Sequence, residues 1–158
     1  ERIIIEGMAR YRRKEKVFKI KGNAISGYGM YAKWDLPKGT ILFQGEEKAQ
    51  RIVTKKFVDE NWDEREKLNF RRYAYPISKD VYILWDLQPE EWSPQNHHCN
   101  ANCSYIGLNV VINRAVQKGE ELTLDYGSFL DETMEPFNCN CGAANCRGLI
   151  KGNAGNKI

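Results

Sequence analysis

The stretch that organises this chain is Asn96-His97-His98-Cys99-Asn100-Ala101-Asn102-Cys103. Amide, imidazole and thiol side chains are concentrated here, and apolar residues are too few for the segment to serve as core packing. A second cysteine-rich stretch, residues 139–146, adds three thiols near the end of the chain. We expect the two stretches to meet in space and to carry the chemistry of the protein.

The composition is that of an ordinary globular protein. The chain has 158 residues, of which 42% are hydrophobic and 28% charged, so it can bury a core as one domain. No apolar run approaches the ~18 residues of a membrane helix, so no membrane partner is expected. Five cysteines, an odd number, argue against a secreted disulfide scaffold and favour a metal site in a reducing, intracellular compartment.

The two ends of the chain differ from its middle. Residues 10–21 include seven basic residues and one acidic residue, although the net charge is only +3. We interpret residues 1–16 as a basic leader. Such a run is most often a solvated surface, and the alternative is a contact with DNA or a nucleosome. Residues 151–158 are rich in Gly, Asn and Lys and are predicted to form a flexible tail.

Short apolar or β-branched segments between turn residues predict a mostly-β fold. The expected extended segments are 17–20, 27–32, 40–43, 73–77, 81–86, 105–112 and 120–126. Residues 54–71 place apolar side chains at helical spacing behind a candidate N-cap, Thr54, and predict one main helix. The cysteines after residue 138 predict a short zinc-binding appendage at the C-terminus.

The last cysteines form an incomplete metal site. Cys139, Cys141 and Cys146 supply three thiols, whereas a closed structural zinc site needs four ligands. The central stretch offers the fourth: Cys99 or Cys103, with His97 and His98 less favoured. Zinc would provide the folding energy for a segment too short and polar to fold alone. The alternative, cysteines buried as small hydrophobic residues, is disfavoured by the neighbouring asparagines.

Four motifs occur in a fixed order along the chain. They are Gly27-Tyr28-Gly29, Asn96-His97-His98-Cys99, Gly119-Glu120-Glu121-Leu122-Thr123-Leu124-Asp125-Tyr126, and Cys139-x-Cys141-x-x-x-x-Cys146-Arg147-Gly148. From about Val17 onward this order resembles the SET-domain protein lysine methyltransferases with a C-terminal post-SET zinc motif. The resemblance implies several small β-sheets around a pseudoknot, in which the segment ending at Tyr126 threads beneath a loop beside Asn96-His97. It divides the chain into a SET domain at 17–130, with an insert at about 48–72, and a post-SET zinc segment at 131–150.

The resemblance also implies the site residues. S-adenosylmethionine would lie against Gly27, Tyr28, Gly29, Asn96 and His97, with Leu149 a contact to its adenine. The catalytic tyrosine would be Tyr126, with Tyr73 at the opposite wall. The zinc ligands would be Cys99, Cys139, Cys141 and Cys146, which leaves Cys103 spare.

The implied activity is S-adenosylmethionine-dependent methyl transfer to the ε-amine of a protein lysine on an extended segment, by family default a histone tail, in the nucleus if the source is eukaryotic. Tyrosine hydroxyls can orient a neutral amine without adding charge, but an unperturbed phenol is mostly protonated at neutral pH, so Tyr126 is not assigned as a general base. Two alternatives stand beside this hypothesis. One is a catalytically silent, zinc-stabilised binding module on the same fold, and the other is an enzyme acting on a non-histone protein.

The sequence departs from the family pattern in three places. Residues 93–95 are Ser-Pro-Gln where an Arg-Phe-Ile-like run is common, and Ala101 stands where Pro is usual. Leu124 replaces the usual Phe or Tyr. Because Leu lacks the ring and the hydroxyl, we expect a wider pocket and the addition of more than one methyl group.

Overall fold

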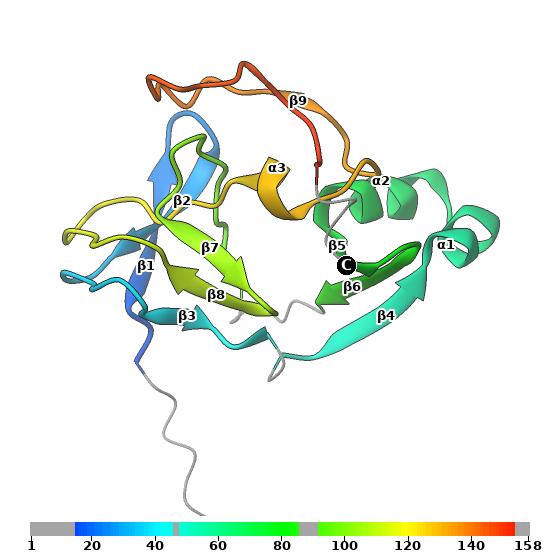
Figure 1. The fold of residues 1–158 in the computed structure, drawn as a ribbon, viewed down its shortest axis with the longest axis horizontal. Helices are drawn as coiled ribbons and strands as arrows, with labels where there is room; N and C mark the ends of the chain where they lie inside the picture. The colour runs from blue at the N-terminus through cyan, green and yellow to red at the C-terminus, as the bar shows by residue number, and fades with distance from the viewer. Residues whose placement is uncertain (1–14, 46–47, 86–91, 154–158) are drawn as a thin grey trace, which may run out of the picture.

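The part of the chain that the structure describes forms four small antiparallel sheets, which contain most of the expected strands and, in addition, strands at 50–54, 137–138 and 149–150 that the sequence did not predict (Figure 1). The structure is a computed structural model, and it describes residues 15–45, 48–85 and 92–153. The sheets contain β1 (Phe18–Asn23) with β2 (Gly27–Ala32), β3 (Ile41–Phe43) with β8 (Asn109–Ile112) and β7 (Cys103–Ile106), β4 (Gln50–Thr54) with β6 (Val81–Trp85) and β5 (Tyr75–Ser78), and β9 (Phe137–Asn138) with β10 (Leu149–Ile150). The mostly-β prediction is therefore confirmed.

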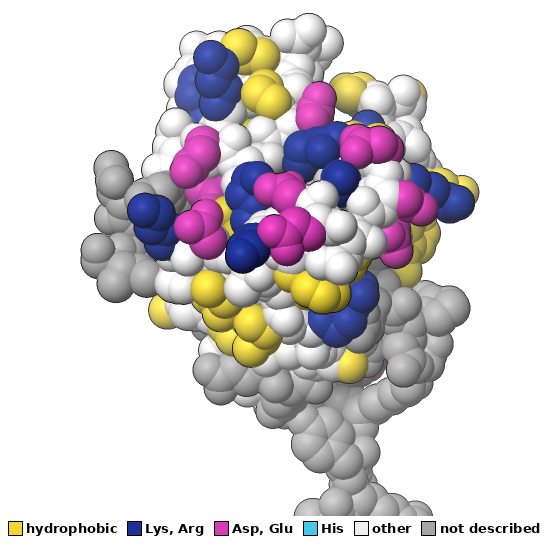
Figure 2. Space-filling view, turned by 90° about the vertical axis from the view of Figure 1, so that its right-hand side faces the viewer, with side chains coloured by type: hydrophobic (Ala, Val, Ile, Leu, Met, Phe, Trp, Pro, Cys, Tyr) yellow, Lys and Arg dark blue, Asp and Glu magenta, His cyan; other side chains and the backbone are white. Residues whose placement is uncertain are grey.

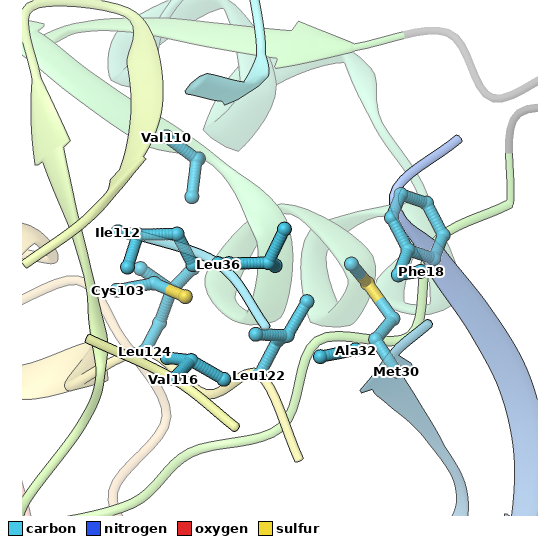
Figure 3. Packing of buried hydrophobic residues seen from close by; sticks show 10 residues of the cluster. All are labelled: Phe18, Met30, Ala32, Leu36, Cys103, Val110, Ile112, Val116, Leu122 and Leu124. Atoms are coloured by element: carbon cyan, nitrogen blue, oxygen red, sulfur yellow. The ribbon is translucent and has the colours of Figure 1, made fainter. Parts of the chain in front are cut away.

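The principal core lies between the β1–β2 hairpin and the β3-β8-β7 sheet. Its side chains point toward one another from segments far apart in the sequence (Figure 3). Met30, Ala32 and Leu122 have no exposed surface. The whole cluster comprises Phe18, Met30, Ala32, Leu36, Cys103, Val110, Ile112, Val116, Leu122 and Leu124. Burial of this apolar surface joins the two sheets into one unit.

The predicted helix is present but is divided in two. Thr54 caps α1 (Lys55–Asn61) by accepting a hydrogen bond from the Phe57 amide, as the sequence indicated. Trp62 and Asp63 then adopt extended backbone angles, and α2 (Glu64–Tyr73) begins. Asp63 accepts from the Glu66 amide at 2.8 Å while the Glu66 side chain accepts from the Asp63 amide at 3.0 Å. This capping box starts a new helix, so the prediction of one continuous helix is wrong at Trp62.

Three other boundaries differ from the prediction. Tyr73 ends α2 instead of beginning a strand, because the helix continues beyond Arg71. The expected strand 105–112 is the hairpin of β7 and β8, which turns at Gly107 with a φ of 58°. The segment 120–126 forms isolated bridges rather than a regular strand, and Tyr126 opens the short helix α3 (Tyr126–Phe129).

That irregular segment crosses the middle of the molecule. Leu124 forms parallel bridges with His97 on one side and with Cys103 on the other. The Leu124 amide donates to the Asn96 carbonyl at 2.9 Å, and the His98 amide donates to the Leu124 carbonyl at 3.0 Å. The segment is therefore bonded on both sides at the place where the resemblance implies a threading, and it holds the central cysteine-containing stretch beside α3.

The helical side of the molecule carries mixed charge. Figure 2 looks onto the side where α1 and α2 lie in Figure 1, and basic and acidic side chains are interspersed over it. Lys55 pairs with Asp59 at 2.5 Å, and Lys67 pairs with Glu64 at 3.3 Å. Within the described ranges, no helix is both long and apolar enough to span a bilayer. Most of the basic leader and of the tail lies outside the described residues.

Replacing Asp63 with alanine should destabilise the fold, because the capping box is lost and amides of the first turn of α2 lose their acceptor. We expect the free energy of unfolding in urea to fall by about 1 kcal/mol. Asp59→Ala is the matched control, since it removes an exposed carboxylate from α1 and should cost less than about 0.5 kcal/mol. Equal losses in the two variants would contradict the assigned cap.

Candidate functional site

The crossing brings Asn96 and His97 against the start of α3. The Tyr126 amide donates to His97 Nδ1 at 3.1 Å, and the Tyr126 hydroxyl donates to the Gln95 carbonyl at 2.5 Å. Burial lowers the pKa of His97, which keeps the imidazole neutral and able to accept. Tyr126 is thus fixed at both its backbone and its hydroxyl by the stretch that precedes Cys99.

The Tyr126 hydroxyl is a hydrogen-bonding group rather than a base. Burial, with Tyr73 close by, raises the pKa of Tyr126 to about 12. The phenol therefore stays protonated at neutral pH, as the sequence argument assumed. Because its proton is directed to the Gln95 carbonyl, its oxygen remains able to accept a hydrogen bond from a ligand.

Two cavities adjoin this tyrosine. The larger, of about 760 Å³, is bounded by the central stretch, the end of α2 and residues 134–141. The smaller, of about 460 Å³, lies mainly among aromatic and aliphatic side chains. The residues that line both are Ser26, Arg72, Tyr73, Asn96 and Tyr126. The two cavities therefore share a wall that contains both predicted catalytic tyrosines.

The smaller cavity has aromatic and aliphatic walls near Tyr126. The Phe129 ring lies 4.7 Å from the Tyr105 ring and 5.8 Å from the Tyr126 ring, measured between centroids. Leu124 lines the same cavity and is almost fully buried. Burial also raises the pKa of Tyr105, so its phenol stays neutral. A space walled in this way excludes water and disfavours a charged group.

A carboxylate that the sequence analysis did not single out holds Asn96. Asn96 Nδ2 donates to Glu121 Oε1 at 2.8 Å and to the Tyr28 carbonyl at 2.7 Å. Asn23 Nδ2 also lies 3.3 Å from Glu121 Oε2. Glu121 lines the larger cavity, and a side chain at Gly29 would place its Cβ 2.3 Å from Glu121 Oε1. A side chain at position 29 would therefore displace this carboxylate from its present place.

The thiols of the two cysteine-rich stretches meet. The Sγ atoms of Cys99, Cys139, Cys141 and Cys146 all lie within 4.8 Å of one another. A tetrahedral zinc site with Zn–S bonds of ~2.3 Å separates its sulfurs by about 3.8 Å, and the Cys99–Cys139 separation is 3.9 Å. Cys103, left open by the spacing argument, lies elsewhere: it is 1% exposed in the principal core and donates to Asn102 Oδ1.

Backbone amides point at the clustered sulfurs. The Cys99 amide donates to Cys141 Sγ at 3.5 Å, and the Arg147 amide donates to Cys99 Sγ at 3.4 Å. Burial opposes ionisation of Cys141, yet the Cys99 and Ala143 amides prevail and lower the pKa of Cys141 to about 6. Cys141 is thus favoured as a thiolate, the form of cysteine that binds metal, whereas burial raises the pKa of Cys139 to about 12.

The remaining predicted residues are placed as follows. Tyr28 lines the smaller cavity, whereas Gly27, Gly29 and Leu149 lie outside the described lining residues of both cavities. Tyr73 is 67% exposed at the shared mouth. Sequence reasoning missed Ser26, Arg72, Tyr105 and Phe129, for which local sequence carries no signal, and Glu121, which lies inside a quoted motif.

Comparison with known proteins agrees with this geometry. The SET domain family model matches residues 27–127. Three relatives are human "Histone-lysine N-methyltransferase 2D" (28% identical, covering 88% of this chain), Drosophila melanogaster "Histone-lysine N-methyltransferase ash1" (28%, 82%) and Arabidopsis thaliana "Histone-lysine N-methyltransferase ASHR3" (30%, 87%). The chain spans only 3%, 6% and 29% of their lengths, respectively.

The methyltransferase domain of human Histone-lysine N-methyltransferase SETMAR has the same fold, with a TM-score of 0.60 at 18% identity over 86% of this chain and 58% of that one. The family match covers more than half of the sequence and contains the crossing segment, Asn96, His97 and Tyr126. The chain belongs to the SET-domain family.

Proposed function

We propose that this protein transfers methyl groups from S-adenosylmethionine to the ε-amine of a lysine in a protein substrate, and that the substrate is a histone tail. One observation carries the proposal: the two cavities share a wall at Tyr126 and Asn96. A methyl donor in the larger cavity and a lysine side chain in the smaller one would approach each other from opposite sides. The names of the relatives support the histone as substrate.

The residues of the larger cavity fit the cofactor. In the parallel bridge with Leu124, hydrogen bonds use the Asn96 carbonyl and the His98 amide, so the amide and carbonyl of His97 point away from Leu124. This pair can recognise a donor and an acceptor on an adenine edge. Asn96 offers a side-chain oxygen nearby, and Phe137 offers an aromatic face. We assign cofactor binding to Asn96 and His97, with the backbone of residues 27–29 and Leu149 as proposed further contacts.

The chain's own residues supply the conditions for the reaction. S-adenosylmethionine, when bound, supplies a methyl group activated by a positively charged sulfur. The walls at Leu124, Tyr105 and Phe129 disfavour the lysine ammonium, lower its pKa and so favour the nucleophilic neutral amine. They also exclude water and hold the amine in line, which are the main contributions that such a site can make.

The two tyrosines are proposed to orient the amine. Tyr126 presents a protonated hydroxyl whose oxygen can accept a hydrogen bond from the neutral amine. Tyr73 lies at the shared mouth and is assigned to the opposite wall. Neither residue is proposed as a general base.

We further propose that Cys99, Cys139, Cys141 and Cys146 hold a structural zinc ion. The four clustered sulfurs and the amides directed at them support this assignment. The zinc segment would then form part of the proposed domain organisation, after a SET domain at 17–130. We also propose a nuclear location for the protein and a contact between its basic leader and nucleosomal DNA.

Replacing Tyr126 with phenylalanine should abolish most methyl transfer, because the amine loses the acceptor that orients it. We expect transfer of labelled methyl to core histones to fall about 100-fold, while calorimetric binding of S-adenosylmethionine is retained. Tyr75→Phe is the matched control: it also removes a hydroxyl that donates to a backbone carbonyl, Gly107, and Tyr75 lines neither described cavity. If wild-type protein binds no cofactor, the silent binding module replaces this proposal.

Replacing Cys99 with serine should remove the zinc ion, because the cluster would lose one of its four thiolates. We expect elemental analysis to find one zinc ion per wild-type chain, little in Cys99→Ser, and a full complement in Cys103→Ser. A lower melting temperature should accompany the loss, since metal binding contributes to folding. Full zinc content in Cys99→Ser would contradict the ligand assignment.

The product should carry more than one methyl group, because Leu124 occupies less of the smaller cavity than Phe or Tyr would. Mass spectrometry of the modified histone peptide should reveal dimethyl-lysine or trimethyl-lysine. Leu124→Tyr should shift the product toward monomethyl-lysine. A wild-type enzyme that never passes the monomethyl state would refute this prediction.

A further inference from the structure

We propose that Glu121 is the positioning residue of the cofactor cavity, and that its carboxylate fixes the amide of Asn96 so that Oδ1 faces the ligand. The inference rests on the proposed function and deepens it. It assigns to Oδ1 the recognition of a cationic donor, the ammonium group of the methionine portion of the cofactor.

Each of the three oxygens around Asn96 Nδ2 can accept a hydrogen bond, and two of them, a carboxylate and a backbone carbonyl, can only accept. Glu121 Oε1 lies at 2.8 Å, the Tyr28 carbonyl at 2.7 Å and Ser26 Oγ at 2.8 Å. If the amide were reversed, Oδ1 would face the carboxylate and the carbonyl, and both contacts would be repulsive. The carboxylate and the Tyr28 carbonyl together therefore set the orientation, and among the described residues no donor to Oδ1 is found.

The carboxylate itself is held only by amides. Asn23 Nδ2 lies 3.4 Å from Oε1 and 3.3 Å from Oε2, and no lysine, arginine or histidine in the described ranges forms an ion pair with Glu121. Its negative charge thus remains beside the larger cavity, where it favours a cationic ligand group. The neighbouring Glu120 differs, since its charge is paired with Arg114 at 2.6 Å and it lines neither described cavity.

Gly29 makes room for this arrangement. A Cβ at position 29 would lie 2.3 Å from Glu121 Oε1, which is closer than atoms can approach, and at a tight 3.2 Å from Asn96 Nδ2. A methyl group there would displace the carboxylate from the asparagine. The second glycine of Gly27-Tyr28-Gly29 therefore serves the cofactor indirectly, through Glu121.

The test is calorimetric binding of S-adenosylmethionine to Glu121→Gln, with Glu120→Gln as the matched control. Glutamine keeps the shape but removes the charge, and it turns an N–H group toward Asn96 or Asn23. We expect binding to weaken about tenfold in Glu121→Gln and to remain within twofold in Glu120→Gln. In steady-state assays the KM for the cofactor should rise while kcat is nearly retained, because Glu121 touches no reacting atom.

A second series tests the steric link. Gly29→Ala should weaken cofactor binding, and in the Glu121→Asp background, where the carboxylate is shorter, the same alanine should cost little more. Such non-additivity is the signature of two residues in contact. Melting temperatures of all variants separate a loss of binding from a loss of fold.

The outcomes distinguish this inference from the function on which it rests. Wild-type protein that fails to bind S-adenosylmethionine would overturn the proposed function, and the inference with it. Wild-type protein that binds, together with Glu121→Gln that binds equally well, would overturn the role of Glu121 alone. Equal weakening in Glu121→Gln and Glu120→Gln would also overturn it, because a general loss of stability would then account for the effect.

Discussion

The structure depends on the backbone hydrogen bonds that the segment around Leu124 makes with the chain on both sides of it. Leu124 is held by Asn96 and His98 on one side, and the Cys103 amide donates to Thr123 on the other. These bonds place His97 against the start of α3 and Cys99 beside the C-terminal cysteines. Tyr126, the thiol cluster and both cavities are brought together by this one crossing.

The sequence indicated which side chains come together better than it indicated the bounds of the helices and strands that carry them. Asn96, His97, Tyr126 and the four cysteines are recognisable because few packing environments favour those side chains, so their order is informative. The predicted bounds of helices and strands are wrong where a capping residue interrupts the apolar pattern. Asp63 fits the face of a helix as well as a cap, and only its exchange of hydrogen bonds with Glu66 shows which role it takes.

The sequence analysis missed several residues of the site for a different reason. Glu121 acquires its role from contacts with Asn23, Gly29 and Asn96 in other segments of the chain, and a glutamate is not unusual where it stands. Tyr105 and Phe129 likewise line the smaller cavity through packing between distant segments. Periodicity and spacing relate residues that are neighbours along the chain, so they cannot identify residues of distant segments that come into contact. The order of the four motifs along the chain does indicate that some distant segments meet.

The thiol cluster and the larger cavity have residues in common. Cys139 and Cys141 belong to the cluster and also line the cavity, together with Phe137 of β9. In Figure 1 the segment that carries them arches over α3. Its own apolar core is small, consisting of Leu130, Met134, Cys139 and Ile150. The proposed zinc ion would therefore stabilise one wall of the cofactor cavity, and its removal should weaken cofactor binding even though no zinc ligand reacts.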